Sequence, residues 1–483
     1  MTDSPTRRSR SRARTARRLT LLSAFLLLLT MLPAGVASAT GRTWTVYPNQ
    51  SIQDAVNRAS SGDVIRLVAG EYKNQAVCVN GKGLTIVGAG ADKTLISWPD
   101  WTKPDVVNAN GSVTPGDQVD APAGGNACWS EWASHDPESV KQGTLQHQLA
   151  DDVSGLFFLN PNGPVTVTGL STLNHTANGI VVEGGKKGVV VYQTKGKGHD
   201  RYGILASNSS NIVIKYNVET AVTRVPSSNT SGNSGTAGVS VSDSANANAL
   251  VQGNRTNGWN IGVFIRESRT GAVVGNDITN SCVGINLFDD TNTEVPPNQA
   301  STINAGNFAV LSNNVHDNHR FCLAGIGQVA ARLKVSGTGI AVVNMDTVLL
   351  KYNTVINNGP ADPVQLLDFP AAGILLLSLP AFNTTTPNAA IPVEKVAVVS
   401  NKVTGNTTAV DPDGPGPQPA FRAPLDIEVG FPPGTVLADP TNPNNPPIPI
   451  PPIGSGILFQ GNTCGYQLVG LGAGNVKIDC GAH

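Results

Sequence analysis

The chain has 483 residues, a formal net charge of −1 and 14% charged residues, which excludes the basic footprint of a nucleic-acid-binding protein. Its 52 glycines and 33 prolines favour short strands joined by tight turns over long helices. We therefore expect an all-β protein with no nucleic-acid partner.

The N-terminus has the pattern of a removable export signal. A basic run from Arg7 to Arg18 precedes an apolar stretch from Leu19 to Leu32 and a small-residue site at Ala37-Ser38-Ala39. The apolar stretch is short for a bilayer span, so an uncleaved anchor is the weaker alternative. We expect a signal peptide over residues 1–39 and a secreted, extracellular mature chain over residues 40–483, with no membrane partner.

Six cysteines follow the predicted signal, and an even number in an exported chain indicates disulfides. No Cys-x-x-Cys pair points to zinc or redox chemistry, and a reactive thiol is the alternative. The six are Cys78, Cys128, Cys282, Cys322, Cys464 and Cys480.

Internal repetition is the strongest pattern in the chain. A glycine followed by a branched apolar residue opens one alternating segment, and a second apolar segment then ends in Asn. The opening Gly262 is followed 14 residues later by Asn276, and 8 residues after that by the next opening glycine, Gly284. The opening glycines are Gly203, Gly238, Gly262, Gly284, Gly339, Gly373 and Gly456. The closing asparagines are Asn217, Asn254, Asn276, Asn314, Asn353 and Asn401.

This period of 22 residues predicts a single-stranded parallel β-helix, a solenoid whose stacked coils form parallel ladders around columns of Val, Ile and Leu. Asn tolerates the left-handed backbone region, and its amide can bond to the Asn of the next coil. We interpret the Asn column as structural.

A short helix is predicted before the repeats. Ser51 has the pattern of an N-cap, and an apolar stripe at helical spacing follows it, at Ile52, Ala55, Val56 and Ala59. We expect this helix to cover the open end of the first coil.

The same N-terminal region resembles the signature of right-handed β-helix proteins of the pectate-lyase-like superfamily, at Ser51-Ile52-Gln53-Asp54-Ala55, Gly62-Asp63-Val64-Ile65 and Gly70-Glu71-Tyr72. The later repeats resemble carbohydrate-binding and sugar-hydrolase repeats of that superfamily, and those of the periplasmic copper-maturation factor of nitrous oxide reductase. The resemblance implies one right-handed parallel β-helix domain over residues 40–483 with a polysaccharide partner. It leaves the activity open, because the fold hosts lyases, hydrolases, epimerases and inert structural proteins.

Three stretches break the period: residues 97–150, Thr291 to Gly306, and a proline-rich stretch, residues 411–452, predicted to be an irregular surface arm. The first holds four tryptophans that we consider candidates for substrate binding, since aromatic faces stack on sugar rings. The alternative is a satellite core under a long loop. The four are Trp98, Trp101, Trp129 and Trp132.

A candidate calcium site comes from aligning the coils on their opening glycines. Five positions later stand Asn208, Asp243, Glu267, Asp289 and Asn344, which should stack about 4.8 Å apart. A cation would relieve the repulsion among Asp243, Glu267 and Asp289. The alternative is that Asp and Asn are simply what a turn after a strand prefers.

A basic cluster from Lys195 to Tyr202 precedes one opening glycine. The resemblance makes β-elimination on uronate polymers a reaction to consider. In that reaction a base removes a proton beside a carboxylate whose charge is neutralised. His199, Arg201 and Arg266 are the candidates for these roles, and a solvated turn is the alternative. The calcium and arginine pattern of pectate lyases is absent from the sequence, and Asp289-Asp290 lacks the surroundings of the polygalacturonase motif.

The first hypothesis is therefore an exported, monomeric, carbohydrate-interacting protein, either a polysaccharide lyase or a hydrolase, with calcium as the conceivable cofactor. The second is a non-catalytic structural or adhesive surface protein. The third is a copper maturation factor, ranked last because the chain has 7 His and 3 Met.

The repeat also predicts the disulfides. Cys282 lies two residues before Gly284, and Cys322 lies three before Gly325, which we take as the start of the next coil. Neighbouring coils lie about 4.8 Å apart, within the roughly 4.4 to 6.8 Å between Cα atoms that a disulfide needs. We expect Cys282 to pair with Cys322 and Cys464 with Cys480, which leaves Cys78 for Cys128.

Overall fold

Three long parallel sheets carry the fold, here named A, B and C. The computed structural model describes residues 41–481 apart from 104–105, 108–112, 120–126, 129–152, 225–235, 290–303, 326–331, 361–366, 368, 380–391, 411–420, 437–445 and 448. The predicted signal peptide thus lies outside the described residues. In the part described, no helix is both long and apolar enough to cross a membrane.

From β2 onward, each coil of the chain visits sheets A, B and C in that order, whereas β1 leads through α2 directly to β2 of the same sheet. Sheet A consists of β1 (Thr43–Val46), β2 (Val64–Leu67), β5 (Thr85–Val87), β10 (Val165–Thr168), β13 (Val189–Tyr192), β16 (Ile212–Lys215), β19 (Ala249–Gln252), β22 (Arg269–Val274), β25 (Gly306–Leu311), β30 (Asp346–Lys351), β33 (Glu394–Val399) and β38 (Leu458–Gln460). Sheet B consists of β3 (Gly70–Lys73), β6 (Thr94–Ser97), β11 (Ser171–Leu173), β14 (Lys195–Lys197), β17 (Val218–Thr220), β20 (Arg255–Asn257), β23 (Asp277–Thr279), β26 (Asn314–His316), β31 (Thr354–Ile356), β34 (Lys402–Thr404), β39 (Asn462–Cys464) and β41 (Cys480–Gly481). Sheet C consists of β4 (Val77–Asn80), β9 (Leu156–Leu159), β12 (Ile180–Glu183), β15 (Tyr202–Ser207), β18 (Ala237–Ser242), β21 (Ile261–Arg266), β24 (Val283–Phe288), β29 (Thr338–Val343), β32 (Ile374–Leu377), β37 (Ile427–Val429) and β40 (Gln467–Val469).

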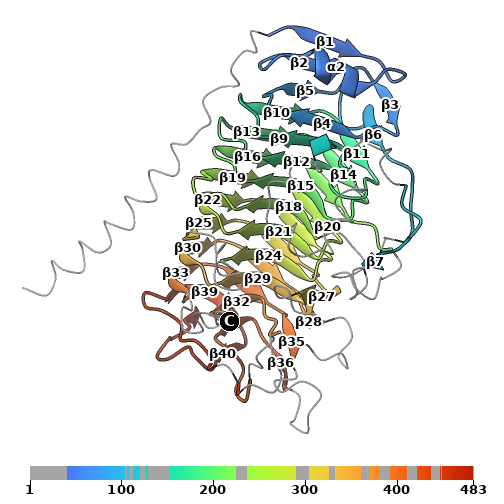
Figure 1. Ribbon diagram of the computed structural model, residues 1–483. Helices are drawn as coiled ribbons and strands as arrows, with labels where there is room; N and C mark the ends of the chain where they lie inside the picture. Colours follow the sequence, from blue (N-terminus) through green and yellow to red (C-terminus); the bar gives the residue numbers. More distant parts are fainter. Residues whose placement is uncertain are drawn as a thin grey trace, which may run out of the picture. The chain divides into compact units, whose positions relative to one another are not determined.

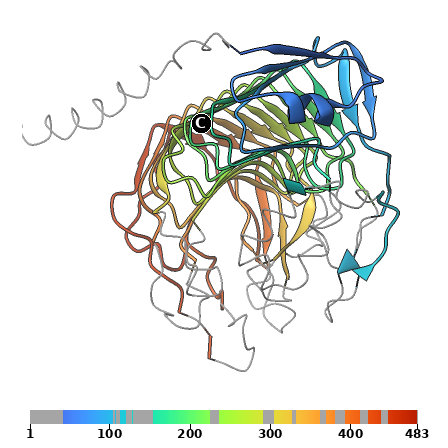
Figure 2. The same ribbon diagram turned by 45° about the horizontal axis from the view of Figure 1, so that its top comes forward.

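The coils stack along one axis, so that the strands of each sheet follow one another from blue to red in Figure 1. Figure 2 shows the same stack tilted toward its N-terminal end. Residues at equal places pair from coil to coil, as in Val239↔Val263 and Val263↔Ile285. The predicted all-β solenoid is confirmed.

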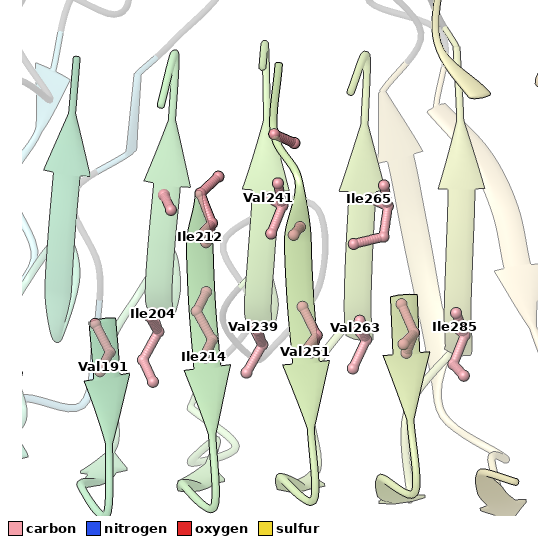
Figure 3. Close-up of a cluster of buried hydrophobic side chains, with 14 of the residues drawn as sticks. Val191, Ile204, Ile212, Ile214, Val239, Val241, Val251, Val263, Ile265 and Ile285 are labelled. Atoms are coloured by element: carbon pink, nitrogen blue, oxygen red, sulfur yellow. The ribbon is translucent and has the colours of Figure 1, made fainter. Parts of the chain in front are cut away.

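The interior is filled by branched apolar side chains from all three sheets. Ile204 and Val239 of sheet C face Ile214 and Val251 of sheet A across the coil, as Figure 3 shows. All four are 1% exposed or less. Each coil therefore supplies the apolar partners that the next coil needs.

The opening glycines are required by the stacking itself. A Cβ built on Gly262 would lie 2.6 Å from the carbonyl oxygen of Gly284, and one on Gly284 would lie 2.6 Å from that of Gly339. Only glycine lets the backbones of successive coils approach this closely. Glycine recurs in the sequence because successive coils make this contact.

The Asn column forms a continuous ladder where sheet A strands turn into sheet B strands, a place named here the A–B corner. Each Asn donates from Nδ2 to the Oδ1 of the Asn in the next coil, at 2.9 Å for Asn313 to Asn353 and 3.0 Å for Asn401 to Asn462. The predicted structural role is confirmed, with one correction. The buried member is Asn313, whereas Asn314 begins β26 and is exposed.

The first helix, α2 (Ile52–Arg58), begins where expected. The Oγ of Ser51 accepts a hydrogen bond from the amide of Asp54 at 3.1 Å. Ile52, Ala55 and Val56 are buried in the main core. That the helix serves as a cap stays a prediction.

Three sequence predictions about the coils are wrong. Gly325 does not open a coil, because it ends β27 (Phe321–Gly325), which pairs with β28 (Arg332–Ser336) as an antiparallel hairpin. Gly456 precedes β38 of sheet A rather than a strand of sheet C. The proline-rich stretch is not irregular throughout, because Ile427–Val429 is a three-residue strand that extends sheet C next to Ile374.

Two more antiparallel hairpins lie outside the sheets, namely β7 (Val106–Val107) with β8 (Val113–Thr114) and β35 (Thr407–Val410) with β36 (Phe421–Pro424).

All three disulfides form with the expected partners, at Cα separations of 5.5 Å for Cys78–Cys128, 6.0 Å for Cys282–Cys322 and 5.3 Å for Cys464–Cys480. The register argument for the second was nevertheless wrong, since Cys322 lies in the β27–β28 hairpin and pairs with Val335 there. That disulfide ties the hairpin to the solenoid.

Candidate functional site

Most of the long connections meet the edges of sheet C; the exception is residues 47–63, which contain α2 and join β1 to β2 within sheet A. Between sheets B and C they span residues 98–155, 221–236, 317–337, 357–373 and 405–426, and between sheets C and A they span 289–305, 378–393 and 430–457. The A–B connections, which all lie within the described residues, are no longer than residues 88–93. Sheet C is therefore the sheet that most of the long connections flank.

The outer face of sheet C presents two columns of side chains, two and four positions after each opening glycine, because residues one and three positions after it point into the core. In the first column stand Phe157, Val181, Leu205, Ser240, Phe264, Asn286, Ala341 and Leu375. In the second stand Leu159, Glu183, Ser207, Ser242, Arg266, Phe288, Val343 and Leu377.

The chemistry of these columns changes along the stack. In the first coils Phe157 and Val181 pack with the disulfide residue Cys128 in an apolar cluster. In the last coils Val343 and Leu375 belong to a second apolar cluster. A polar group that we name the sheet C patch begins on the strand of Val181 and continues toward the second cluster; it is made of Glu183, Ser207, Ser240, Ser242, Asp243 and Arg266.

Hydrogen bonds join the members of the sheet C patch. Nη1 of Arg266 lies 3.0 Å from Oδ1 of Asp243, and the Oγ of Ser207 donates to the other carboxylate oxygen at 3.3 Å. The hydroxyls of Ser240 and Ser242 are 2.9 Å apart. The serines are buried, whereas the side chains of Asp243 and Arg266 are 37% and 21% exposed. A ligand would therefore meet the charged groups first.

The two carboxylates of the patch stand in unlike surroundings. Burial raises the pKa of Glu183, and the charge of Asp243 adds to that rise, although hydrogen bonds from Ser207 and Asn208 and the charge of Lys186 oppose it. Asp243 instead has the guanidinium of Arg266 beside it. A carboxyl with a raised pKa, such as that of Glu183, suits a proton donor.

The predicted calcium ladder has the expected register but not the expected geometry. The backbone amide of Asp243 bonds to the carbonyl of Arg266, that of Glu267 to Phe288 and that of Asp289 to Val343, so the residues do follow one another. The carboxylates nevertheless bond to different partners. Oδ2 of Asp289 accepts from the amide of Ala305 at 3.0 Å, whereas Asp243 pairs with Arg266. Among the described residues, no three His, Cys, Asp or Glu side chains are grouped so as to hold a metal ion.

Backbone conformation explains why these positions are polar. Asn208, Asp243, Glu267 and Asn344 have φ values of 48°, 51°, 42° and 54°, in the left-handed region that Asn and Asp tolerate best. The turn preference accounts for most of the predicted column.

The three predicted catalytic residues are not brought together. His199 is fully buried before β15, with Nε2 3.0 Å from Oγ1 of Thr172 and its ring stacked on His175. Arg266 lies at the far end of its strand in the same sheet, and Arg201 is half-buried near the start of β15. A buried imidazole cannot contact a polymer at the surface, so His199 is not retained for the site. Arg266 belongs to the outward columns of sheet C, and a role for Arg201 stays a prediction.

The tryptophans of the first insertion divide in a similar way. Trp101 is 3% exposed, donates from Nε1 to the carbonyl of Asn174 at 2.8 Å and lies under the guanidinium of Arg224, so it packs as a satellite core. Trp98 is 6% exposed but borders a cavity that is described below. Trp129 and Trp132 lie outside the described residues.

Sequence reasoning missed Glu183, Ser207, Ser240 and Ser242. A signal for Glu183, Ser207 and Ser242 was present in the sequence. Like Arg266, which stands four positions after Gly262, they stand four positions after a glycine, namely Gly179, Gly203 and Gly238. The prediction instead took the residues five positions after each opening glycine, which are the turn residues and not the outward-pointing side chains.

Comparison with known proteins agrees with the fold. Residues 178–390 match the family model described as a right handed beta helix region. No curated protein sequence matches the chain significantly.

Several solved structures are similar to the chain at low identity. The A-module of the Azotobacter vinelandii mannuronan C-5 epimerase AlgE6 is 12% identical, with 86% of this chain and 93% of that one covered and a TM-score of 0.44. The periplasmic alginate epimerase AlgG is 14% identical, with coverage of 80% and 82% and a TM-score of 0.34. The catalytic domain of a GH87 alpha-1,3-glucanase in complex with nigerose is 13% identical, with coverage of 89% and 69% and a TM-score of 0.34. Likenesses this distant do not bear on what this chain binds.

Proposed function

This chain is a right-handed parallel β-helix repeat protein, and from that premise we propose that it is an exported protein that binds a polysaccharide along the outer face of sheet C. The observation that carries the proposal is the sheet C patch, a polar group on a sheet face that is apolar toward both ends. The long connections at both edges of sheet C support it, because binding residues commonly lie where loops flank a rigid scaffold.

The stacking suits a repeating ligand. A linear polymer that runs along the solenoid axis meets a new coil about every 4.8 Å. Asp243 and Arg266 offer acceptors and donors for sugar hydroxyls, and Phe264 and Phe288 supply apolar faces beside them. The proposed ligand is thus a long carbohydrate chain rather than a small molecule.

Binding is tested with the secreted protein on uronate and neutral polysaccharides, with and without calcium. We expect Arg266→Ala to weaken binding at least tenfold, because it removes the guanidinium donors of the patch and leaves the charge of Asp243 without its cation. Arg255→Ala is the matched control, since Arg255 is exposed on sheet B. Equal affinities of wild type and Arg266→Ala for the polymer would reject the patch.

A second step, hydrolysis, is favoured by the unlike carboxylates. Glu183 and Asp243 stand two coils apart, which corresponds to roughly 10 Å between backbones, close to the separation of about 6.5 to 9.5 Å typical of inverting glycosidases. In this proposal Glu183 protonates the leaving oxygen, and Asp243 activates the water that attacks the sugar carbon. The bond between that carbon and the leaving oxygen breaks as the bond to water forms.

The catalytic part has its own readout. We expect reducing ends without the absorbance of an unsaturated product, and loss of at least a hundredfold in rate for Glu183→Gln with binding retained. Glu71→Gln, on the outer side of sheet B, is the control. Unsaturated product would indicate a lyase, whereas binding without any product would leave an adhesive protein.

A further inference from the structure

A cavity of about 880 Å³ lies at the N-terminal end of sheet C. Helix α2 forms one wall, the segment from Asn74 to Lys82 forms another, and Trp98 with its neighbours in the first insertion closes the third. Cys78 and Asn80 border it on the outer side of β4, since Val77 and Val79 point into the core. The apolar cluster around Phe157 separates this cavity from the sheet C patch.

The lining is polar in an unusual way. Five primary amides border the cavity together with one hydroxyl, one ammonium group and one indole, but no carboxylate is among the lining residues. Primary amides both donate and accept, as sugar hydroxyls require, and an indole offers a flat apolar face. The amides are those of Gln53, Asn57, Asn74, Gln75 and Asn80. The amides of Gln53 and Gln75 are bonded within the walls, so a ligand would meet chiefly those of the three asparagines.

The walls are held rigidly. The amide of Gln53 exchanges two hydrogen bonds with the backbone of Cys78, at 2.9 and 2.8 Å. Gln75 accepts from the amide of Ile52 at 3.1 Å, and the disulfide to Cys128 fixes the insertion over the strand. A cavity whose walls are fixed in advance loses little entropy when a ligand enters.

The charge in the cavity comes from Lys82. Its Nζ donates to the carbonyls of Val56 and Asn57 at 3.0 and 3.1 Å, which uses two of the three N–H groups of an ammonium. The third donor and the positive charge suit an anion in a lining without acids.

We propose that this cavity is a second carbohydrate site, which binds a short acidic oligosaccharide or the end of an acidic chain, with a sugar carboxylate at Lys82 and a ring beside Trp98. The proposal rests on the proposed function, because it takes the ligand class from it. It adds that the protein holds an acidic sugar apart from the sheet C patch.

The experiment measures binding of tetragalacturonate and of neutral galactotetraose by calorimetry. Asn80→Trp fills the cavity from an exposed position, and we expect it to weaken tetragalacturonate binding at least tenfold. Lys82→Met should cost as much for the acidic probe and little for the neutral one, whereas Lys82→Arg should restore binding. Lys73→Met, exposed on sheet B, is the control, and thermal melting confirms that each variant folds.

The outcomes separate the two sites. Wild-type affinity of Asn80→Trp for tetragalacturonate, or no binding of that probe to the wild type, overturns the cavity proposal. If Asn80→Trp retains binding while Arg266→Ala loses the polymer, the cavity proposal fails and the proposed function stands. If Asn80→Trp loses the tetrasaccharide and Arg266→Ala leaves polymer binding unchanged, the cavity stands and the sheet C patch fails.

Discussion

The A–B corner and the corner where sheet B strands turn into sheet C strands, the B–C corner, differ although the same coils form both. At the A–B corner one residue type repeats from Asn217 to Asn462, and each amide bonds to its neighbours. At the B–C corner only the later coils carry such a ladder, at Asn318, Asn358 and Asn406. In the earlier coils the same place holds unlike residues, namely His175, His199, Val222, Trp259 and Ser281.

Polar atoms without a partner gather beside the B–C corner of the earlier coils. They include Nδ1 of His175 and His199, Oε2 of Glu219 and Nε1 of Trp259, all of them buried. An orphaned buried polar atom costs stability. Uniform corners thus maximise stability, whereas the interrupted corner gives up part of it and carries the insertions around sheet C.

The largest effect is expected where the ladder is unbroken. Asn313→Ala leaves the amide and Nδ2 of Asn276 and the carbonyl of Val273 without their partners, which should cost about 3 to 5 kcal/mol. Chemical denaturation measures the free energy of unfolding, with Asn314→Ala as the exposed neighbour for control. A cost below about 1 kcal/mol would mean that the ladder contributes little to the free energy of unfolding.

The next effect concerns the disulfide that ties the β27–β28 hairpin to the B–C corner. Replacing Cys282 and Cys322 by Ser should lower the free energy of unfolding by about 2 to 4 kcal/mol. The bridge from Cys464 to Cys480 spans 16 residues against 40, so its removal should cost about 0.8 kcal/mol less by chain entropy. A larger loss from the shorter loop would show that native contacts, rather than the unfolded chain, decide the effect.

The same contrast explains what the sequence could reveal. Gly262 and Asn276 recur because each coil imposes the same backbone contact and the same amide bond, and such constraints leave a periodic trace. Solenoid fold, core columns and Asn ladder were therefore predictable. The strand Ile427–Val429 was not, because three residues among prolines show no period.

The candidate site was harder to predict for physical reasons. Asp243 is polar both because a left-handed turn favours it and because it pairs with Arg266, and sequence alone cannot separate the two causes. His199 stands in a charged segment typical of a surface turn, yet its ring packs inside against His175. Stacking between coils decides such cases, and it depends on residues 24 positions away.

The last effect is a change in pH dependence at the B–C corner. Burial raises the pKa of Glu219 well above its usual range. Its carboxyl lies against Gly196 and Gly203, in the space that a Cβ on either residue would take. The folded chain keeps this proton, while the unfolded chain releases it above about pH 4.3. The folded state thus binds more protons, and stability falls as pH rises, by at most about 1.4 kcal/mol per pH unit.

Glu219→Gln keeps the shape and removes this titration, so its advantage over the wild type in free energy of unfolding should grow from pH 5 to pH 8. The histidines act in the opposite sense. Burial lowers the pKa of His175 to about 4 and lowers the pKa of His199 well below its usual range, so protons bind first to the unfolded chain below about pH 6.5 and stability falls toward acid. This acid loss should persist unchanged in Glu219→Gln, and Glu71→Gln, exposed on sheet B, should follow the wild type throughout. Parallel stability curves for Glu219→Gln and the wild type between pH 5 and pH 8 would show that Glu219 is not kept protonated in the fold.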